Sequence, residues 1–96
     1  MKKELQIVRL TTGEELVCEV TEFPEHQVQL SDVAIIIPTE GGIGMMYFMP
    51  YADLGEGIVI DASHVMWATT PNEELAARWK TMFKKILTPT TTKIII

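Results

Sequence analysis

The chain has 96 residues, a composition that is 47% hydrophobic and 22% charged, and a formal net charge of -5 at pH 7. This length allows one domain with a thin core and excludes a second catalytic domain, and the composition is that of a globular protein rather than a disordered or collagen-like one. One cysteine and two histidines exclude an internal disulfide and a Cys/His zinc cluster, and they favour a reducing, cytoplasmic compartment. We expect no signal peptide and no membrane partner, because no apolar stretch approaches the roughly 20 residues of a membrane helix.

The charge is unevenly distributed along the chain. From Met1 to Asn72 there are three bases and eleven acids, a balance of -8, whereas from Glu73 to Ile96 there are five bases and two acids, a balance of +3. An acidic body repels phosphate, so any contact with nucleic acid must use a local patch rather than the overall field of the protein.

The first part of the chain predicts three strands separated by turn residues. Leu5–Thr11 is rich in β-branched and aliphatic residues, and Thr12-Gly13 supplies a tight turn. The run 15–23 alternates with a period of two, which predicts a half-buried strand. After the polar turn at 24–27, the strand at 28–37 ends in consecutive isoleucines, which indicate burial on both faces at that end.

The segment 44–49 is the most informative in the sequence. Its five consecutive large apolar residues place apolar side chains on both faces of a strand, which one small core cannot cover, so we expect a partner subunit there. A bend at 50–57 leads to a strand at 58–60, a turn at 61–64 and a strand at 65–68. This makes five strands, or six if the bend divides the fourth.

A helix over 70–87 is predicted from its cap and its apolar stripe. Thr70 is the expected N-cap, Pro71 the first helical residue and Glu73 the partner that completes a capping box. The apolar stripe consists of Leu75, Trp79, Met82, Phe83 and Ile86. The tail at 88–96 is either a frayed end or an added edge strand.

Together these elements predict a mainly β fold in one domain spanning 1–96. Its strands over 5–69 form a small, five-stranded, strongly bent open barrel, and one C-terminal amphipathic helix follows. A barrel of this kind cannot close its own sheet edges.

No residue pattern predicts catalysis, a metal site or a cofactor. The GGIG segment at 41–44 lies between two strands and lacks the helix and Lys-Ser/Thr of a phosphate-binding loop. Cys18 lies in mid-strand with no base nearby in sequence, which favours a core role over a nucleophile. Asp53, Glu56 and Asp61 could form an acid/base pair or bind a hard cation, but they show none of the loop spacing of a calcium site, which favours solvated loop carboxylates.

Two segments resemble the motifs of Sm-like (LSm) proteins. The stretch IVRLTTGEELVCEV at 7–20 is similar to the opening of the first Sm motif, and IDASHV at 60–65 is similar to the second. The matching positions are Leu10, Gly13, Val20, Ile60 and Val65. The resemblance covers residues 5–69 and is to the divergent Sm-like proteins of tailed phages, cyanophages in particular. It implies an SH3-like barrel, and for a phage protein it implies the host cytoplasm as the compartment.

The chain departs from the family pattern at four places. Cys18 stands at the second glycine of the first motif, and the turn at 24–27 replaces an Asp and a Met-Asn pair that help to hold a base. Asp61-Ala62 replaces the Arg-Gly of the second motif, and the helix follows the last strand instead of preceding the first. These departures affect the family's uridine pocket rather than its barrel.

The resemblance implies a ring of roughly five to seven identical subunits, in which the fourth strand of one copy pairs with the fifth strand of the next. The expected interface residues are Met45, Met46, Tyr47, Phe48, Met49, Val65, Met66 and Trp67. The loops expected to face the pore carry His26, Gln27, Asp61, Ser63 and His64. There the histidines could stack on bases and the glutamine could hydrogen-bond base edges. The basic helix face is an alternative phosphate site and consists of Arg78, Lys80, Lys84 and Lys85.

The leading hypothesis is a non-catalytic, homo-oligomeric ring that binds RNA or single-stranded DNA. The alternative is a phage structural or assembly protein that uses the barrel only for protein–protein contacts, which the net acidity and the missing Asn and Arg-Gly favour. A lone histidine in a turn is more often a surface residue than a ligand. A small-molecule-binding barrel or an enzyme has no support in the sequence.

Overall fold

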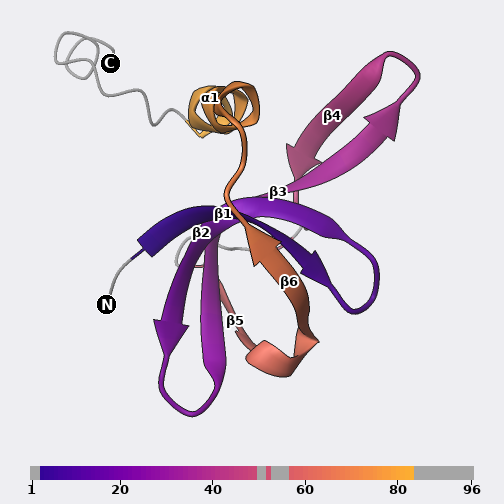
Figure 1. Cartoon of the computed structure of the whole chain (residues 1–96). Coiled ribbons are helices and arrows are strands. Elements are labelled where there is room, and N and C mark those ends of the chain that lie inside the picture. Colours follow the sequence, from indigo (N-terminus) through magenta and orange to yellow (C-terminus); the bar gives the residue numbers. More distant parts are fainter. Residues whose placement is uncertain (1–2, 50–51, 53–56, 84–96) are drawn as a thin grey trace, which may run out of the picture.

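The computed structural model describes residues 3–49, 52 and 57–83. These residues form six strands in one bent sheet, a short 3-10 helix and one α-helix (Figure 1). The elements are β1 (Lys3–Leu10), β2 (Glu15–Phe23), β3 (Gln27–Thr39), β4 (Gly42–Tyr47), β5 (Ile58–Asp61), η1 (Ala62–His64), β6 (Val65–Thr69) and α1 (Glu73–Met82). The predicted mainly β fold with one C-terminal helix is confirmed.

The long strand β3 organises the sheet. The strand order is β4-β3-β2-β1-β6, with every neighbouring pair antiparallel. One edge of β3 pairs with β2, and the other edge is divided between β5, which pairs with Gln27–Leu30, and β4, which pairs with Ala34–Thr39. The bend after β4 therefore divides the expected fourth strand, and the described residues contain six strands rather than five.

Two apolar cores lie on opposite faces of the bent sheet. The barrel core inside the bend contains the buried residues Val8, Leu16, Cys18, Leu30 and Val33. The helix core between the sheet and α1 contains Val17, Ala34, Leu75 and Trp79. Consecutive residues of β2 thus enter different cores, because side chains alternate across a strand. The predicted apolar face of this strand is buried at Leu16 and Cys18, and Val17 on the other face is buried as well, because it packs with the helix core.

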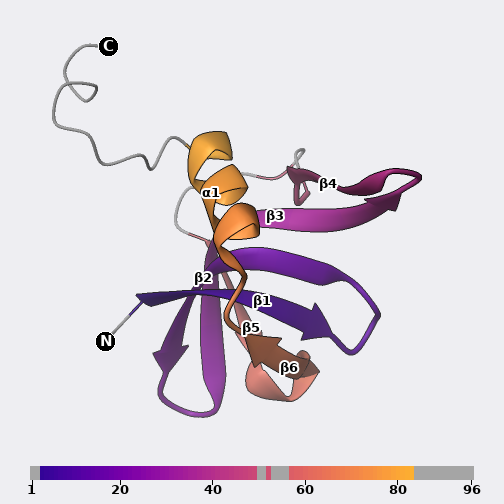
Figure 2. The same cartoon turned by 45° about the horizontal axis from the view of Figure 1, so that its top comes forward.

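The hairpin of β3 and β4 extends away from the barrel (Figures 1 and 2). We expected burial on both faces at the far end of β3, but of its last residues only Ala34 is buried, and Ile35, Ile36 and Ile37 are half-buried. The reason is that these isoleucines lie in the projecting hairpin, where α1 packs on one side only.

Helix α1 is capped by Asn72 rather than by Thr70. The Asn72 side chain accepts a hydrogen bond from the backbone N–H of Leu75 at 2.8 Å, so the helix begins at Glu73 and the predicted capping box was wrong. The predicted apolar stripe is confirmed at Leu75 and Trp79, which are buried, and at Met82 and Phe83, which pack against them. The predicted residues 84–87 and the tail at 88–96 lie outside the described residues.

The indole N–H of Trp79 fixes α1 to the sheet. It donates to the backbone oxygen of Asp32 in β3 at 2.8 Å, between residues that are 47 positions apart. Trp79 is 2% exposed, so its ring also supplies much of the apolar area that the helix buries. Full burial of one large apolar side chain contributes about 1.5–3 kcal/mol.

Gly57 permits β5 to approach β3. Its φ is +89°, and a Cβ built at this position would lie 2.4 Å from the backbone oxygen of Leu30, closer than real Cβ contacts. Ile58, the next residue, pairs directly with Leu30. Any side chain at position 57 would therefore both strain the backbone and push β5 away from β3.

We predict that Gly57→Ala lowers the free energy of unfolding by roughly 1–3 kcal/mol, because alanine would be held at positive φ against a carbonyl oxygen. The measurement is the midpoint of urea unfolding, monitored by circular dichroism. Gly41→Ala is the control, because Gly41 has open space around its Cβ position. Equal midpoints for the two variants would contradict this account.

Candidate functional site

The five residues expected to face a pore come together at one end of the barrel. The turn before β3 contacts η1 through a hydrogen bond from the backbone N–H of Ala62 to the oxygen of His26 at 2.8 Å, and Gln27 pairs with Asp61. The backbone oxygen of His64 accepts from the N–H of Thr11 at 2.9 Å, which joins the turn after β1 to the same end. We call His26, Gln27, Asp61, Ser63 and His64 the loop cluster.

Asp61 is the structural centre of the loop cluster. Its carboxylate caps η1 by accepting a hydrogen bond from the backbone N–H of Ser63 at 2.9 Å. This hydrogen bond is the main cause that lowers the pKa of Asp61, with smaller contributions from the Ser63 hydroxyl and from the charges of His26 and His64. The carboxylate is therefore ionised at neutral pH, and the loop cluster has a fixed negative charge with no lysine or arginine among its members.

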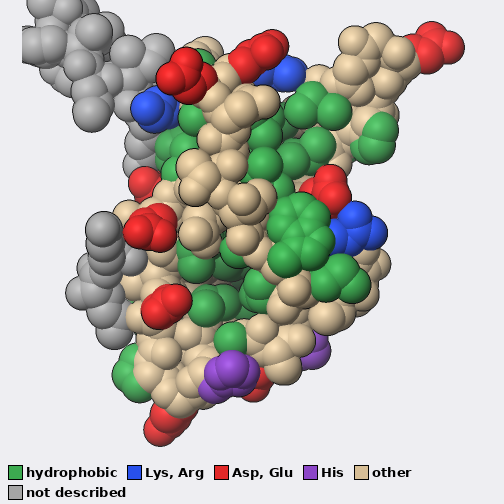
Figure 3. Space-filling model, viewed as in Figure 1, with side chains coloured by type: hydrophobic (Ala, Val, Ile, Leu, Met, Phe, Trp, Pro, Cys, Tyr) green, Lys and Arg blue, Asp and Glu red, His purple; other side chains and the backbone are tan. Residues whose placement is uncertain are grey.

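The basic residues of the helix lie far from the loop cluster. Figure 3 shows both histidines at the end of the molecule opposite α1. The guanidinium of Arg78 donates to the backbone oxygen of Ile43 at 3.1 Å, so it supports the projecting hairpin. Lys80 is exposed on α1. The other two residues of the predicted phosphate site, Lys84 and Lys85, lie outside the described residues.

The two outermost strands of the sheet expose large apolar side chains. Strand β4 exposes Met46 and Tyr47, and β6 exposes Met66 and Trp67, each between 42% and 58%. Among the residues that the structure describes, each of these strands has a hydrogen-bonded neighbour on one side only. Such an edge offers unpaired backbone groups to another strand. We call the outer borders of β4 and β6 the two assembly edges.

Not all of the predicted interface residues are exposed at these edges. Met45 packs against the helix core, and Phe48 and Val65 pack against the barrel core, so these three are half-buried. Met49 is also half-buried. Ile43 on β4 is also 42% exposed. Sequence reasoning missed it, because the predicted apolar segment began one position later, at residue 44.

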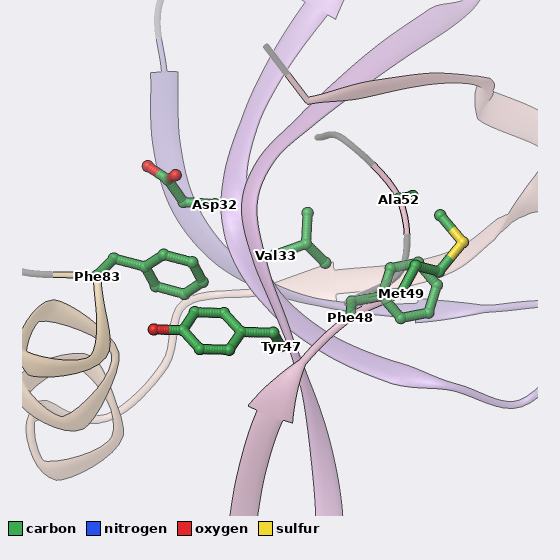
Figure 4. A pocket seen from close by; sticks show the side chains of 7 residues that line it. All are labelled: Asp32, Val33, Tyr47, Phe48, Met49, Ala52 and Phe83. Carbon is green, nitrogen blue, oxygen red and sulfur yellow. The ribbon is translucent and has the colours of Figure 1, made fainter. Parts of the chain in front are cut away.

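A pocket that the sequence did not predict lies between β3, the end of β4 with the residues that follow it, and the end of α1 (Figure 4). Residues 31–33 of β3 lie between the segments that pair with β5 and with β4, and this gap leaves a cavity of about 230 Å³. The lining residues are Asp32, Val33, Tyr47, Phe48, Met49, Ala52 and Phe83. We call this pocket the notch. Because it combines three segments that are distant in sequence, no local pattern could reveal it.

Ring contacts and a hydrogen bond connect the aromatic residues in the wall of the notch. Tyr47 and Phe83 meet edge to face, with ring centroids 5.3 Å apart and an interplanar angle of 85°. The hydroxyl of Tyr47 donates to the backbone oxygen of Met82 at 3.1 Å, and Phe83 also packs on Trp79 at 5.4 Å. This wall therefore joins the end of β4 to the end of α1.

Of the remaining candidates for chemistry, Cys18 lies in the described part of the chain. Cys18 is fully buried, and burial, with a smaller effect of the Glu19 charge, raises its pKa to about 12. Asp53 and Glu56 lie outside the described residues. Within the described part of the chain, no group of three or more His, Cys, Asp or Glu residues could hold a metal ion, and no helix there is long and apolar enough to cross a membrane.

Comparison with protein-family models and with curated protein sequences returned no match. The relationship to Sm-like proteins therefore stays a prediction from the two motif-like segments.

We predict that the Cys18 thiol of the folded protein is unreactive. With a pKa of about 12, about one thiol in 10⁴ is ionised at pH 8, and the thiolate is the reactive species. Alkylation by iodoacetamide at pH 8 should be at least about 1,000-fold slower in native buffer than in 6–8 M urea, roughly as the thiolate fractions imply. Comparable rates in the two conditions would show that Cys18 is accessible.

Proposed function

We propose that this chain is the subunit of a homo-oligomeric ring that binds single-stranded nucleic acid at its loop cluster without catalysing a reaction. Copies join through the two assembly edges, β4 of one copy to β6 of the next. The observation that carries the proposal is that both ends of the strand order expose large apolar side chains.

The two assembly edges favour head-to-tail association. They are different strands with different residues, so joining them is a heterologous contact, which closes into a ring or continues as a filament. The joint would pair backbone groups that have no partner in the described part of the chain. It would also cover Met46 and Tyr47 on one side and Met66 and Trp67 on the other. Monomeric proteins seldom leave such groups exposed together on sheet edges.

The resemblance to Sm-like proteins supports the same joint. It implies pairing of the fourth strand with the fifth strand of the next copy, and in the six-stranded sheet these correspond to β4 and β6. Ring closure rather than a filament also follows from that resemblance.

The loop cluster supports binding of bases rather than of phosphates. The imidazole rings of His26 and His64 can stack on bases, and the Gln27 amide and Ser63 hydroxyl can hydrogen-bond base edges. In a ring, each subunit would repeat this set, so several weak contacts would act on one strand. The Asp61 carboxylate opposes binding by repelling phosphate.

A structural or assembly role is the second candidate. It is favoured by the net charge of -5 and by the ionised Asp61 in the loop cluster. In this function the assembly edges make the same contacts, but no nucleic acid binds.

We predict that edge variants reveal the polarity of the joint. Met46→Glu should disable the β4 edge and Met66→Glu the β6 edge, because each places a charge in an apolar contact, and both side chains are more than half exposed in the subunit. Each variant alone should be monomeric in sedimentation velocity. An equimolar mixture should form a 1:1 dimer and nothing larger, because it retains one intact edge of each kind.

The control for the edge variants is Val59→Glu. Val59 lies on β5 and is 47% exposed, so the same change there should leave assembly unchanged. If Met66→Glu alone still dimerises, the joint is β4 to β4 and the head-to-tail proposal fails. Loss of assembly in Val59→Glu would likewise contradict the assignment of the joint to β4 and β6.

We predict that Asp61→Asn strengthens binding of a short, labelled single-stranded RNA by roughly 3–10-fold at low salt, because it removes a nearby negative charge. Asparagine can still accept the Ser63 N–H and cap η1. Glu74→Gln, on α1, removes the same charge outside the loop cluster and should have little effect. His64→Ala should weaken binding by about 5-fold or more through lost stacking.

The measurement is fluorescence polarisation, with RNA and single-stranded DNA titrated at two salt concentrations. Equal effects of Asp61→Asn and Glu74→Gln would place the bound strand away from the loop cluster. No binding by the wild type or by Asp61→Asn at micromolar protein would reject nucleic-acid binding and support the structural role.

A further inference from the structure

We infer that the notch receives the Trp67 side chain of the neighbouring copy in the ring. This inference rests on the proposed joint between β4 and β6, and it names the contact that anchors that joint. The occupant is thus a second copy of this chain rather than a small molecule or a peptide.

The position of the notch favours an occupant that approaches along the β4 edge. Its walls include Tyr47, the last residue of β4, and Phe48 and Met49, which follow directly. Phe48 is held against β3 by a hydrogen bond from its N–H to the oxygen of Val33 at 3.1 Å. A strand added to the outer edge of β4 therefore ends beside the opening of the notch.

The backbone around the notch is in an unfavourable conformation. Asp32 and Met49 line it from two different segments, and their φ angles are +50° and +49°. Non-glycine residues rarely adopt the left-handed region, and where they do the strain is concentrated at binding sites and other functional positions. Two residues of the notch wall are thus held in this conformation at an energetic cost.

Trp67 has the size and chemistry to fill the notch. It lies in the middle of β6, is 42% exposed and is paired with Arg9. No other described strand pairs with β6, so its outer edge offers a place for another chain. An indole side chain fits within about 230 Å³, and the rings of Tyr47, Phe48 and Phe83 offer edge and face contacts to it. Tryptophan is among the residues that are enriched at the energetically dominant positions of protein interfaces.

The inference also fixes the register of the joint. Trp67 must lie opposite the last residues of β4, near Tyr47, rather than opposite Ile43 at the far end. The competing site for Trp67 is a shallow groove between β4 and α1, lined by Met45, Ala77, Arg78, Thr81 and Met82.

The experiment is a double-mutant cycle on the association of the subunits. Trp67→Ala removes the proposed anchor, and Ala52→Phe fills the notch from its own wall. Each single variant should weaken association at least about 10-fold in sedimentation equilibrium, as expected for an interface anchor. The double variant should be no weaker than the worse single variant, because each change removes the same contact.

The matched comparison is Ala77→Phe, which fills the competing groove instead. Coupling of Trp67→Ala with Ala77→Phe, or additive effects of Trp67→Ala and Ala52→Phe, would overturn the inference. Circular dichroism of each variant monomer at high dilution checks that the fold is retained. If Ala52→Phe is unfolded, Ala52→Gly, which enlarges the notch, replaces it. An anchor in the notch should then couple Ala52→Gly to Trp67→Ala, and the absence of coupling overturns the inference.

Tryptophan fluorescence separates failure of this inference from failure of the proposed ring. The chain has two tryptophans, and Trp79 is 2% exposed, so the difference between wild type and Trp67→Phe reports Trp67. On assembly its emission should shift to shorter wavelength and its quenching by acrylamide should fall about 3-fold or more, as for a side chain removed from water. Assembly with Trp67 still quenched overturns the inference alone, whereas no assembly rejects the ring as well.

Discussion

The open edges of the sheet are the constraint on which the rest of the structure depends. β3 is long enough to pair with β2 on one edge and with both β4 and β5 on the other, so the sheet bends around it without closing. This leaves β4 and β6 at the two ends of the strand order. At both ends, backbone groups that have no partner among the described residues occur together with large apolar side chains. Pairing with another strand would bond these backbone groups and cover the side chains.

The sequence was sufficient to predict what depends on local spacing. Period-two alternation predicted β2, and the 3.6-residue stripe predicted that Leu75 and Trp79 face the sheet. The turns at 24–27 and 61–64, which carry the residues of the loop cluster, were also predicted from turn residues, but their contact through Ala62 and His26 depends on the pairing of β3 with β5. The capping residue was misidentified because Thr70 and Asn72 are both good caps, and only the entry path of the chain decides between them.

The notch and the burial of β2 could not be predicted, for one physical reason. Both depend on how distant segments pack. Helix α1 covers Val17. The ring of Tyr47 meets that of Phe83, and its hydroxyl bonds the backbone oxygen of Met82, which is 35 positions away in sequence. Alternation in a strand shows which residues share a face, but it does not show whether a later helix covers the other face. The charges of the loop cluster, by contrast, were visible in the sequence, and the structure adds that a hydrogen bond keeps Asp61 ionised.

The molar mass of the wild-type protein in dilute buffer tests the central claim most directly. Light scattering at low micromolar concentration should return a fixed multiple of the 10.8 kDa chain mass, independent of concentration, as a closed ring requires. A mass equal to one chain would contradict the account, because the exposed apolar edges of β4 and β6 would then be stable in water without a partner.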